Sequence, residues 1–305
     1  MPDYFDLQVN GYAGVDFNQD DLTAEHLNKA CEKLAADGVG GVLATIITEQ
    51  LPVMAHRLRR LAELREQSPL AKRVIAGLHV EGPFLNDTPG YRGAHPSDAM
   101  QPATTDAMQT LLDAGSGLVR LVTLAPERDE SFRVTALLAK SGVTVSAGHT
   151  DASYDQLSGS IDAGLTLFTH LGNGCPMQMH RHDNIIQRAL AHAAAGRLTP
   201  CFIADGVHVP FIALKNYLAV AGAQRCIVVT DAIAPASLGP GRYKLARWDL
   251  LIGDDMVARA PDGSHFVGSA ITMPQTAANL RDKLALSDDA IDALIANNPR
   301  RAVGL

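Results

Sequence analysis

The sequence contains few aromatic residues, few cysteines and no long apolar run. Aromatic residues make up 5% of the 305 residues, although hydrophobic residues reach 47%, which is enough for a substantial core. The four cysteines form no Cys-x-x-Cys pair, so we expect reduced thiols rather than disulfides. No apolar stretch approaches the roughly 18 residues of a membrane span, and the N-terminus lacks a basic segment followed by an apolar one. We therefore expect a cytoplasmic protein without a membrane partner.

Positive charge is also scarce. Lysine and arginine number 26 against 33 aspartate and glutamate residues, which gives a formal net charge of −7. Nucleic acid is therefore not an expected partner, because surfaces that bind it are strongly basic. An anionic substrate would need a local basic pocket against this background.

Short β-branched apolar runs alternate with longer amphipathic stretches along the whole chain, which predicts strands that alternate with helices. The predicted strands are residues 4–10, 39–47, 74–81, 118–125, 143–149, 166–172, 201–208 and 226–231. The predicted helices include residues 23–36, 53–67, 104–114, 131–140, 153–163, 210–221 and 273–286. Eight strands, each followed by a helix, predict an α/β protein with a (β/α)8 TIM barrel. We expect residues 1–305 to form this single domain.

One segment, residues 239–268, interrupts the alternation. It contains the turn signals Gly-Pro-Gly, Gly-Asp-Asp and Pro-Asp-Gly at close spacing. This pattern predicts a β-hairpin inserted after the eighth strand.

Acidic and imidazole side chains occur where the predicted strands end. The active site of such a barrel lies at the carboxyl ends of its strands, and here these ends carry Glu81, His149, His170 and Asp231. Two histidines, one glutamate and a water form an open catalytic zinc site, beside which a carboxylate can take the proton of the water. We therefore predict a divalent metal, zinc, at this rim of the barrel.

Each of these residues also has a purely structural interpretation. A lone histidine can be a hydrogen-bonded structural residue, Glu81 can cap the turn at Gly-Pro, and Asp231 can cap the next helix. Their occurrence at the same level of several strands favours the metal site.

The first predicted strand lacks the His-x-His pair that many metal-dependent hydrolases carry there. Gln8 and Asn10 occupy those places, and the alternation of Leu7 with Val9 predicts that the two amides share the opposite face. Both amides are neutral. The strand therefore leaves the number of bound metals in question.

Seven segments together resemble the N-acetylglucosamine-6-phosphate deacetylase family of the amidohydrolase superfamily. In chain order they are D-L-Q-V-N-G-Y-A-G-V-D-F-N, G-L-H-V-E-G-P-F-L-N, S-A-G-H-T, T-H-L-G-N-G, I-A-D-G-V-H-V, V-T-D-A-I-A-P-A and G-S-A-I-T-M. The final N-P-R-R-A-V-G is similar to the end of the family's barrel. The resemblance implies a hydrolase that removes the acetyl group from an N-acetylated amino sugar phosphate, N-acetylglucosamine 6-phosphate above all.

The resemblance also implies how the metal is held. Family members with Gln-x-Asn on the first strand bind one metal, which here would be held by Glu81, His149 and His170. Gln8 and Asn10 would orient this site without binding the ion. The end of the fourth strand carries no lysine that could bridge two metals.

Further roles follow from the same resemblance. His95 matches the residue that polarises the acetyl carbonyl, and Asp231 would return its proton to the leaving amine. His208 matches a sugar-contacting position, and the backbone at Asn173 and Gly174 matches a phosphate site. Arg181 matches an arginine that binds phosphate, often in the site of the neighbouring subunit. Such sharing implies a homodimer.

The sequence departs from the family pattern in the substrate-facing loop. The family's His-Leu-Tyr-Asn-Ala-Met-Pro and Arg-Glu-Pro-Gly become H-L-G-N-G-C-P and R-H-D-N here. An amidohydrolase that acts on an unphosphorylated N-acyl or cyclic amide substrate therefore remains an alternative, and an inactive binding protein is a more remote one. We also expect a short version of the family without its small β-sandwich, because few residues precede the first strand.

Overall fold

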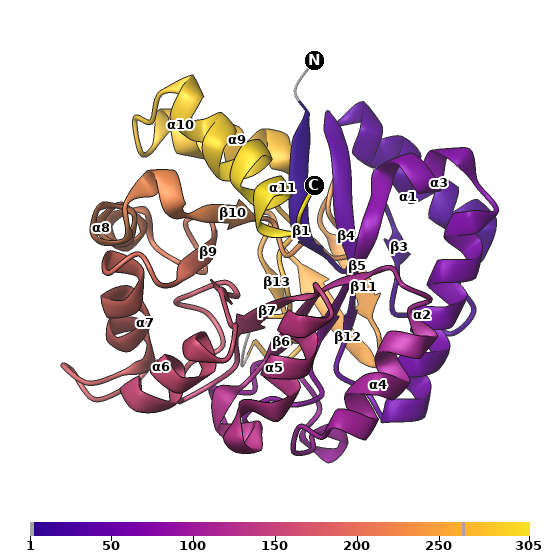
Figure 1. Ribbon diagram of the computed structural model, residues 1–305. Helices are drawn as coiled ribbons and strands as arrows, with labels where there is room; N and C mark the ends of the chain where they lie inside the picture. Colours follow the sequence, from indigo (N-terminus) through magenta and orange to yellow (C-terminus); the bar gives the residue numbers. More distant parts are fainter. Residues whose placement is uncertain (1–2, 264–265) are drawn as a thin grey trace.

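The computed structural model describes residues 3–263 and 266–305, and its centre is a sheet of eight parallel strands (Figure 1). The strands pair in the order β1-β4-β5-β6-β7-β8-β9-β10, so each lies beside the next parallel strand along the chain. Their bounds are Tyr4–Val9 (β1), Val39–Ile47 (β4), Ile75–Glu81 (β5), Val119–Leu124 (β6), Thr144–Ala147 (β7), Leu167–Phe168 (β8), Thr199–Ile203 (β9) and Ile227–Val229 (β10). This arrangement confirms the predicted (β/α)8 barrel.

The barrel closes between β1 and β10 through a short seam. Val9 and Ala232 form a parallel bridge, and the backbone N–H of Asn10 donates to the carbonyl of Ala232 at 2.7 Å. Nearer the start of β1, both carboxylate oxygens of Asp6 lie 3.3 Å from the backbone nitrogen of Thr230. The buried side chain of Asp6 therefore joins β1 to the end of β10 at a point where no strand pairing between them is found among the described residues.

Helices surround the sheet on its outer side (Figure 1). Seven of them start after a serine, threonine or asparagine whose side-chain oxygen accepts a backbone N–H of the first turn, a favourable cap. The bounds are Ala24–Ala36 (α1), Leu51–Glu66 (α2), Pro69–Val74 (α3), Thr105–Ala114 (α4), Arg133–Lys140 (α5), Tyr154–Asp162 (α6), Ile185–Ala194 (α7), Phe211–Ala221 (α8), Met273–Asp282 (α9), Asp288–Asp292 (α10) and Asn298–Ala302 (α11). Within the described residues, none of the helices has the length and apolar character needed to cross a membrane.

Several predicted boundaries were wrong. The sequence pattern predicted strands at 166–172 and 201–208, but β8 ends at Phe168 and β9 at Ile203. The remaining residues of both segments turn away from the sheet into loops that carry site residues. The helices named from the sequence did not include α3, α7, α10 or α11.

The first strand also differs from its expected alternation. Leu7 packs in an apolar cluster inside the barrel, whereas Val9 packs in the cluster between sheet and helices. The register of β1 against β4 shifts between Asp6 and Val9, which explains why the two apolar side chains do not share a face. Gln8 and Asn10 nevertheless both reach the site.

A small antiparallel sheet follows the eighth barrel strand. It consists of β11 (Gly241–Leu245), β12 (Trp248–Ile252) and β13 (Ala258–Arg259). The first two strands form a hairpin, and β13 pairs with β12, so the segment 239–268 holds a three-stranded sheet where we expected a two-stranded hairpin. Residues 264 and 265 of this segment lie outside the described residues. Arg247, in the turn of the hairpin, pairs with Glu49 and Asp98 of the barrel loops and so ties the insertion to the mouth of the barrel.

Candidate active site

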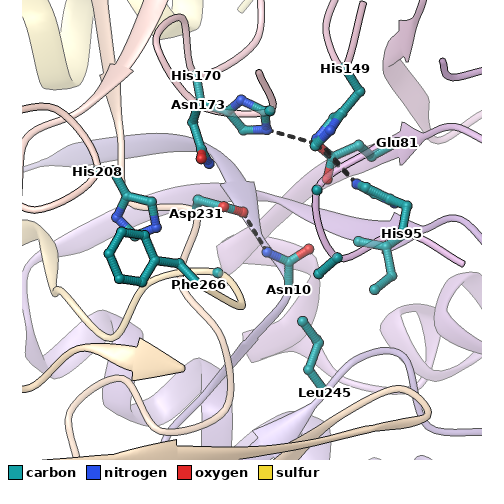
Figure 2. A pocket seen from close by; sticks show the side chains of 15 residues that line it. Asn10, Glu81, His95, His149, His170, Asn173, His208, Asp231, Leu245 and Phe266 are labelled. Atoms are coloured by element: carbon teal, nitrogen blue, oxygen red, sulfur yellow. Dashed lines mark hydrogen bonds and ion pairs between the residues drawn. The ribbon is translucent and has the colours of Figure 1, made fainter. Parts of the chain in front are cut away.

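A pocket opens at the carboxyl ends of the barrel strands (Figure 2). Most of the residues predicted for the site line it. The lining consists of Asn10, Ile47, Glu81, Gly93, Ala94, His95, His149, His170, Asn173, Gly174, His208, Asp231, Leu245, Phe266 and Gly268. Leu245 and Phe266 come from the insertion and were missed by the sequence analysis, because only the tertiary fold brings them to the barrel.

Three imidazoles surround one carboxylate oxygen of Glu81. The Nε2 atoms of His170, His149 and His95 lie 3.1, 3.4 and 4.0 Å from Oε1 of this residue. The Nε2 atoms of His95 and His149 are 3.2 Å apart. Burial raises the pKa of Glu81, but hydrogen bonds from His149 and His170 outweigh it and hold the pKa well below its usual value. Glu81 is therefore an ionised carboxylate among nitrogen ligands.

These separations fit a metal site. Ligands at about 2.0–2.1 Å from a tetrahedral ion lie roughly 3.3 Å from one another, close to the distances among these atoms. The ligand atoms of Glu81, His95 and His149 all lie within 4.8 Å of one another. This compact group contains His95 in place of the predicted ligand His170, although His170 makes the shortest histidine contact to Glu81. Two overlapping ligand sets therefore share Glu81 and His149.

The orientation of His149 favours metal binding. Its Nδ1 lies 2.8 Å from the carbonyl oxygen of Tyr91, and a carbonyl can only accept a hydrogen bond. Nδ1 therefore carries a proton, and Nε2, which lies 3.4 Å from Oε1 of Glu81, is the ring nitrogen that remains available to a metal. Gly174 has a positive φ of 61°, and a Cβ at this position would lie 2.8 Å from Nδ1 of His149. A side chain there would push His149 out of place.

The two amides of the first strand contact the two carboxylates of the site. Nε2 of Gln8 lies 3.1 Å from each carboxylate oxygen of Glu81. Nδ2 of Asn10 donates to Oδ1 of Asp231 at 2.7 Å (Figure 2). Each amide thus fixes the orientation of one carboxylate.

Asp231 is buried at the edge of this cluster. Burial, followed by the negative charge of Glu81, raises its pKa to about 7. A carboxylate with a pKa near neutrality is suited to accept a proton and later return it, because both of its forms are accessible.

Three site residues have a strained backbone. His149, His170 and Asp231 have φ values of 50°, 31° and 53°, in the region that non-glycine residues rarely adopt. Each follows a parallel strand, so the turn occurs where the strand gives way to its loop. Such outliers gather at functional sites, where the surrounding structure holds them in place.

The predicted substrate residues divide into two groups. Asn173, Gly174 and His208 line the pocket, but Arg181 is exposed on the loop that precedes α7 and is not among the lining residues. No lysine or arginine of the described residues lines this pocket. His208 also has a partner that the sequence analysis missed, Asp205, whose carboxylate lies 2.6 Å from its Nδ1.

A (β/α)8 barrel that brings carboxylate and histidine ligands together at its strand ends has the architecture of an amidohydrolase. Comparison with known proteins identifies a family within this class of enzymes. No protein-family model matches the chain. Human N-acetylglucosamine-6-phosphate deacetylase is 30% identical over 309 residues, which cover all of this chain and 74% of the human protein. N-acetylgalactosamine-6-phosphate deacetylase from Escherichia coli O157:H7 is 28% identical over 304 residues, which cover all of this chain and 78% of that protein.

A solved structure agrees with these relatives. The N-acetylglucosamine-6-phosphate deacetylase of Mycobacterium smegmatis, a mutant in complex with N-acetyl-D-glucosamine-6-phosphate, superposes with a TM-score of 0.89. It is 31% identical, and the match covers all of this chain and 77% of that one. The chain belongs to the N-acetylglucosamine-6-phosphate deacetylase family, as its sequence motifs indicated.

Proposed function

We propose that the protein hydrolyses the acetyl amide of N-acetylglucosamine 6-phosphate to the free amine and acetate. The observation that carries this proposal is the placement of Asp231, with its pKa near 7, beside a group of one carboxylate and three imidazoles. Amide hydrolysis needs an activated water, a stabilised oxyanion and a proton for the leaving amine. The pocket offers a residue for each need.

The donor set of the pocket suits one divalent metal, for which we propose zinc. Glu81, His149 and His170 would hold it, with His95 left free to act on the substrate. When bound, the ion supplies Lewis acidity and lowers the pKa of a bound water. Gln8 and Asn10 would orient Glu81 and Asp231, and neither amide would bind the ion.

The remaining chemistry belongs to the side chains. Asp231 accepts the proton of the attacking water and then transfers it to the amine as the carbon–nitrogen bond breaks. Burial lowers the pKa of His95 to about 3, so its imidazole is neutral and has one ring proton to donate. A hydrogen bond from His95 to the carbonyl oxygen would stabilise the charge that develops there in the transition state.

The sugar and its phosphate would occupy the outer part of the pocket. His208 would contact a sugar hydroxyl, and the backbone at Asn173 and Gly174 would receive the phosphate. Arg181 is exposed, so we propose that it reaches the phosphate in the pocket of a second subunit. The loop before α7 would then lie near the interface of a homodimer.

One observation favours a second candidate function. The described pocket lining contains no lysine or arginine, whereas a phosphate dianion is usually bound through charge-assisted hydrogen bonds. An amidohydrolase that acts on an unphosphorylated N-acyl sugar or cyclic amide would not need such a charge.

The decisive experiment is a release assay for acetate with the purified, zinc-loaded protein. The substrates are N-acetylglucosamine 6-phosphate, N-acetylgalactosamine 6-phosphate and free N-acetylglucosamine. We expect the first to have the highest kcat/KM. A preference for the free sugar would favour the second candidate, and metal binding without turnover of any amide would indicate a binding protein.

A further inference from the structure

His208 and Asp205 form a buried pair at the rim of the pocket. Nδ1 of His208 lies 2.6 Å from Oδ2 of Asp205, and the side chains of the two residues are 2% and 14% exposed. The ring of Phe266 lies against the imidazole, with 5.2 Å between the ring centroids (Figure 2). The other ring nitrogen, Nε2, is buried and has no hydrogen-bond partner among the described residues.

The carboxylate of Asp205 is itself held in one orientation. Its Oδ1 accepts the backbone N–H groups of Val207 and His208, each at 2.9 Å. Gly206 makes this fold-back possible, because its φ is +78° and a Cβ there would lie 2.5 Å from the ring of Phe211. Oδ1 is thereby occupied, and Oδ2 is left to face the imidazole.

The charge of Asp205 determines which atom of the pair carries the proton. Burial raises the pKa of Asp205, but the hydrogen bonds from His208 and the backbone outweigh it, so the pKa lies below the usual value. An ionised carboxylate accepts hydrogen bonds and cannot donate them. Nδ1 of His208 must therefore be the donor, and in the neutral ring the buried, unpartnered Nε2 carries a lone pair.

We propose that Asp205 is a positioning residue that fixes this tautomer. Nε2 of His208 then accepts a hydrogen bond from a hydroxyl group of the substrate. The inference rests on the proposed function for the identity of the substrate and extends it to the polarity of one subsite. The pocket then selects a sugar that can donate a hydrogen bond at that position, and it disfavours one with an acceptor alone.

Asp205→Asn tests the proposal because it reverses the polarity of the pair. The two backbone N–H groups keep the amide oxygen of the asparagine in the place of Oδ1. Its NH2 group then faces Nδ1 of His208, which must accept, and the proton moves to Nε2. Asp255→Asn is the matched control, because Asp255 is an acidic residue of the neighbouring surface pocket and pairs with Arg259.

The first measurement is nitrogen-15 NMR of the imidazoles at neutral pH, with His208→Gln used to assign the signals of His208. We expect the Nδ1–H tautomer in the unmodified protein and in Asp255→Asn, and the Nε2–H tautomer in Asp205→Asn. An Nε2–H tautomer or a doubly protonated ring in the unmodified protein would overturn the proposal.

The second measurement compares kcat/KM for deoxy and deoxyfluoro analogues of N-acetylglucosamine 6-phosphate, altered at carbon 3 or carbon 4. Fluorine cannot donate a hydrogen bond, so the unmodified protein should use the fluoro analogue no better than the deoxy one. Asp205→Asn should reverse this order at one of the two positions, by roughly 2- to 10-fold, the scale of one neutral hydrogen bond. A switched tautomer without reversal at either position would refute the role in recognition.

The two measurements separate failure of this inference from failure of the proposed function. Absence of turnover of the parent sugar phosphate by the unmodified protein would contradict the proposed function. The NMR experiment needs no substrate and tests the tautomer in either case.

Discussion

Nε2 of Gln8 lies 3.1 Å from both carboxylate oxygens of Glu81. The amide thus contacts both oxygens of the carboxylate, while the imidazoles of His149 and His170 contact Oε1. A neutral donor at this point replaces the histidine that many metal-dependent hydrolases carry on their first strand. Gln8 therefore orients Glu81 without adding to the ligands that we propose.

The first prediction concerns this contact. Gln8→Leu should weaken metal binding by about 10- to 100-fold, the usual effect of losing a partner of a metal ligand. Competition with a chromogenic chelator measures the change. Gln109→Leu is the control, since Gln109 donates to Asp113 at 2.8 Å on an exposed helix face. Equal affinity in the two variants would show that Gln8 does not support the ligand.

The second prediction is that one metal ion is bound per chain. The first strand offers the two neutral amides of Gln8 and Asn10, so a second ion would lack ligands on that side of the pocket. Elemental analysis of the dialysed protein should give about one equivalent of zinc. Two tightly bound equivalents that are both required for activity would contradict this stoichiometry.

The sequence predicted the end of the barrel at which the site lies, but not the detailed geometry of the site. Strand periodicity was sufficient to place Glu81, His149, His170 and Asp231 at one rim, because parallel strands end on the same face of a barrel. It could not predict that His149 turns into the left-handed region, since that conformation depends on the surrounding loops.

Tertiary contacts account for most of what was missed. Leu245 and Phe266 reach the pocket through a sheet whose packing on the barrel leaves no short-range signal in the sequence. Asp205, in contrast, lies only three residues before His208, and the D-G-V-H string could have suggested their contact. Arg181 was predicted by family resemblance alone, and it lies outside the pocket.

The third prediction tests that arginine. Arg181→Ala should raise KM for N-acetylglucosamine 6-phosphate roughly tenfold or more and leave KM for an unphosphorylated substrate nearly unchanged, because a charge-assisted hydrogen bond is lost. Steady-state kinetics of both substrates gives the comparison, with Arg59→Ala as an exposed control on α2. Equal effects on the two substrates would assign Arg181 a structural role.

Light scattering should report a dimer, and a fully active monomer would exclude a shared site.

The fourth prediction concerns the proposed base. Asp231→Asn should keep the metal and lose turnover by roughly 10²- to 10⁴-fold, because an amide cannot take the proton of the water. Asn10 would face an amide of similar shape, so the fold should persist. Metal content and kcat measured on the same preparation distinguish loss of the base from loss of the ion. A variant with nearly unchanged kcat would remove Asp231 from this role.

The last prediction concerns the seam of the barrel, where burial raises the pKa of Asp6 from 3.8 to about 7. Between these values the folded protein binds a proton that the unfolded chain has released. The free energy of unfolding should therefore fall as the pH rises from about 4 to 7, with a contribution of at most about 1.4 kcal/mol per pH unit from this one group. Asp6→Asn stays neutral throughout, so it should flatten the slope.

Urea unfolding at a series of pH values from 4 to 8 measures this slope for the parent protein and the variant. Asp254→Asn serves as the control, because Asp254 is exposed in the turn after β12 and its loss should leave the slope as it is. The hydroxyl and backbone N–H of Thr230 both donate to the carboxyl of Asp6 and partly offset its burial. Thr230→Val removes the hydroxyl and should extend the falling part of the curve to higher pH. Parallel curves for the parent protein and Asp6→Asn would mean that Asp6 is not the group that titrates in this window.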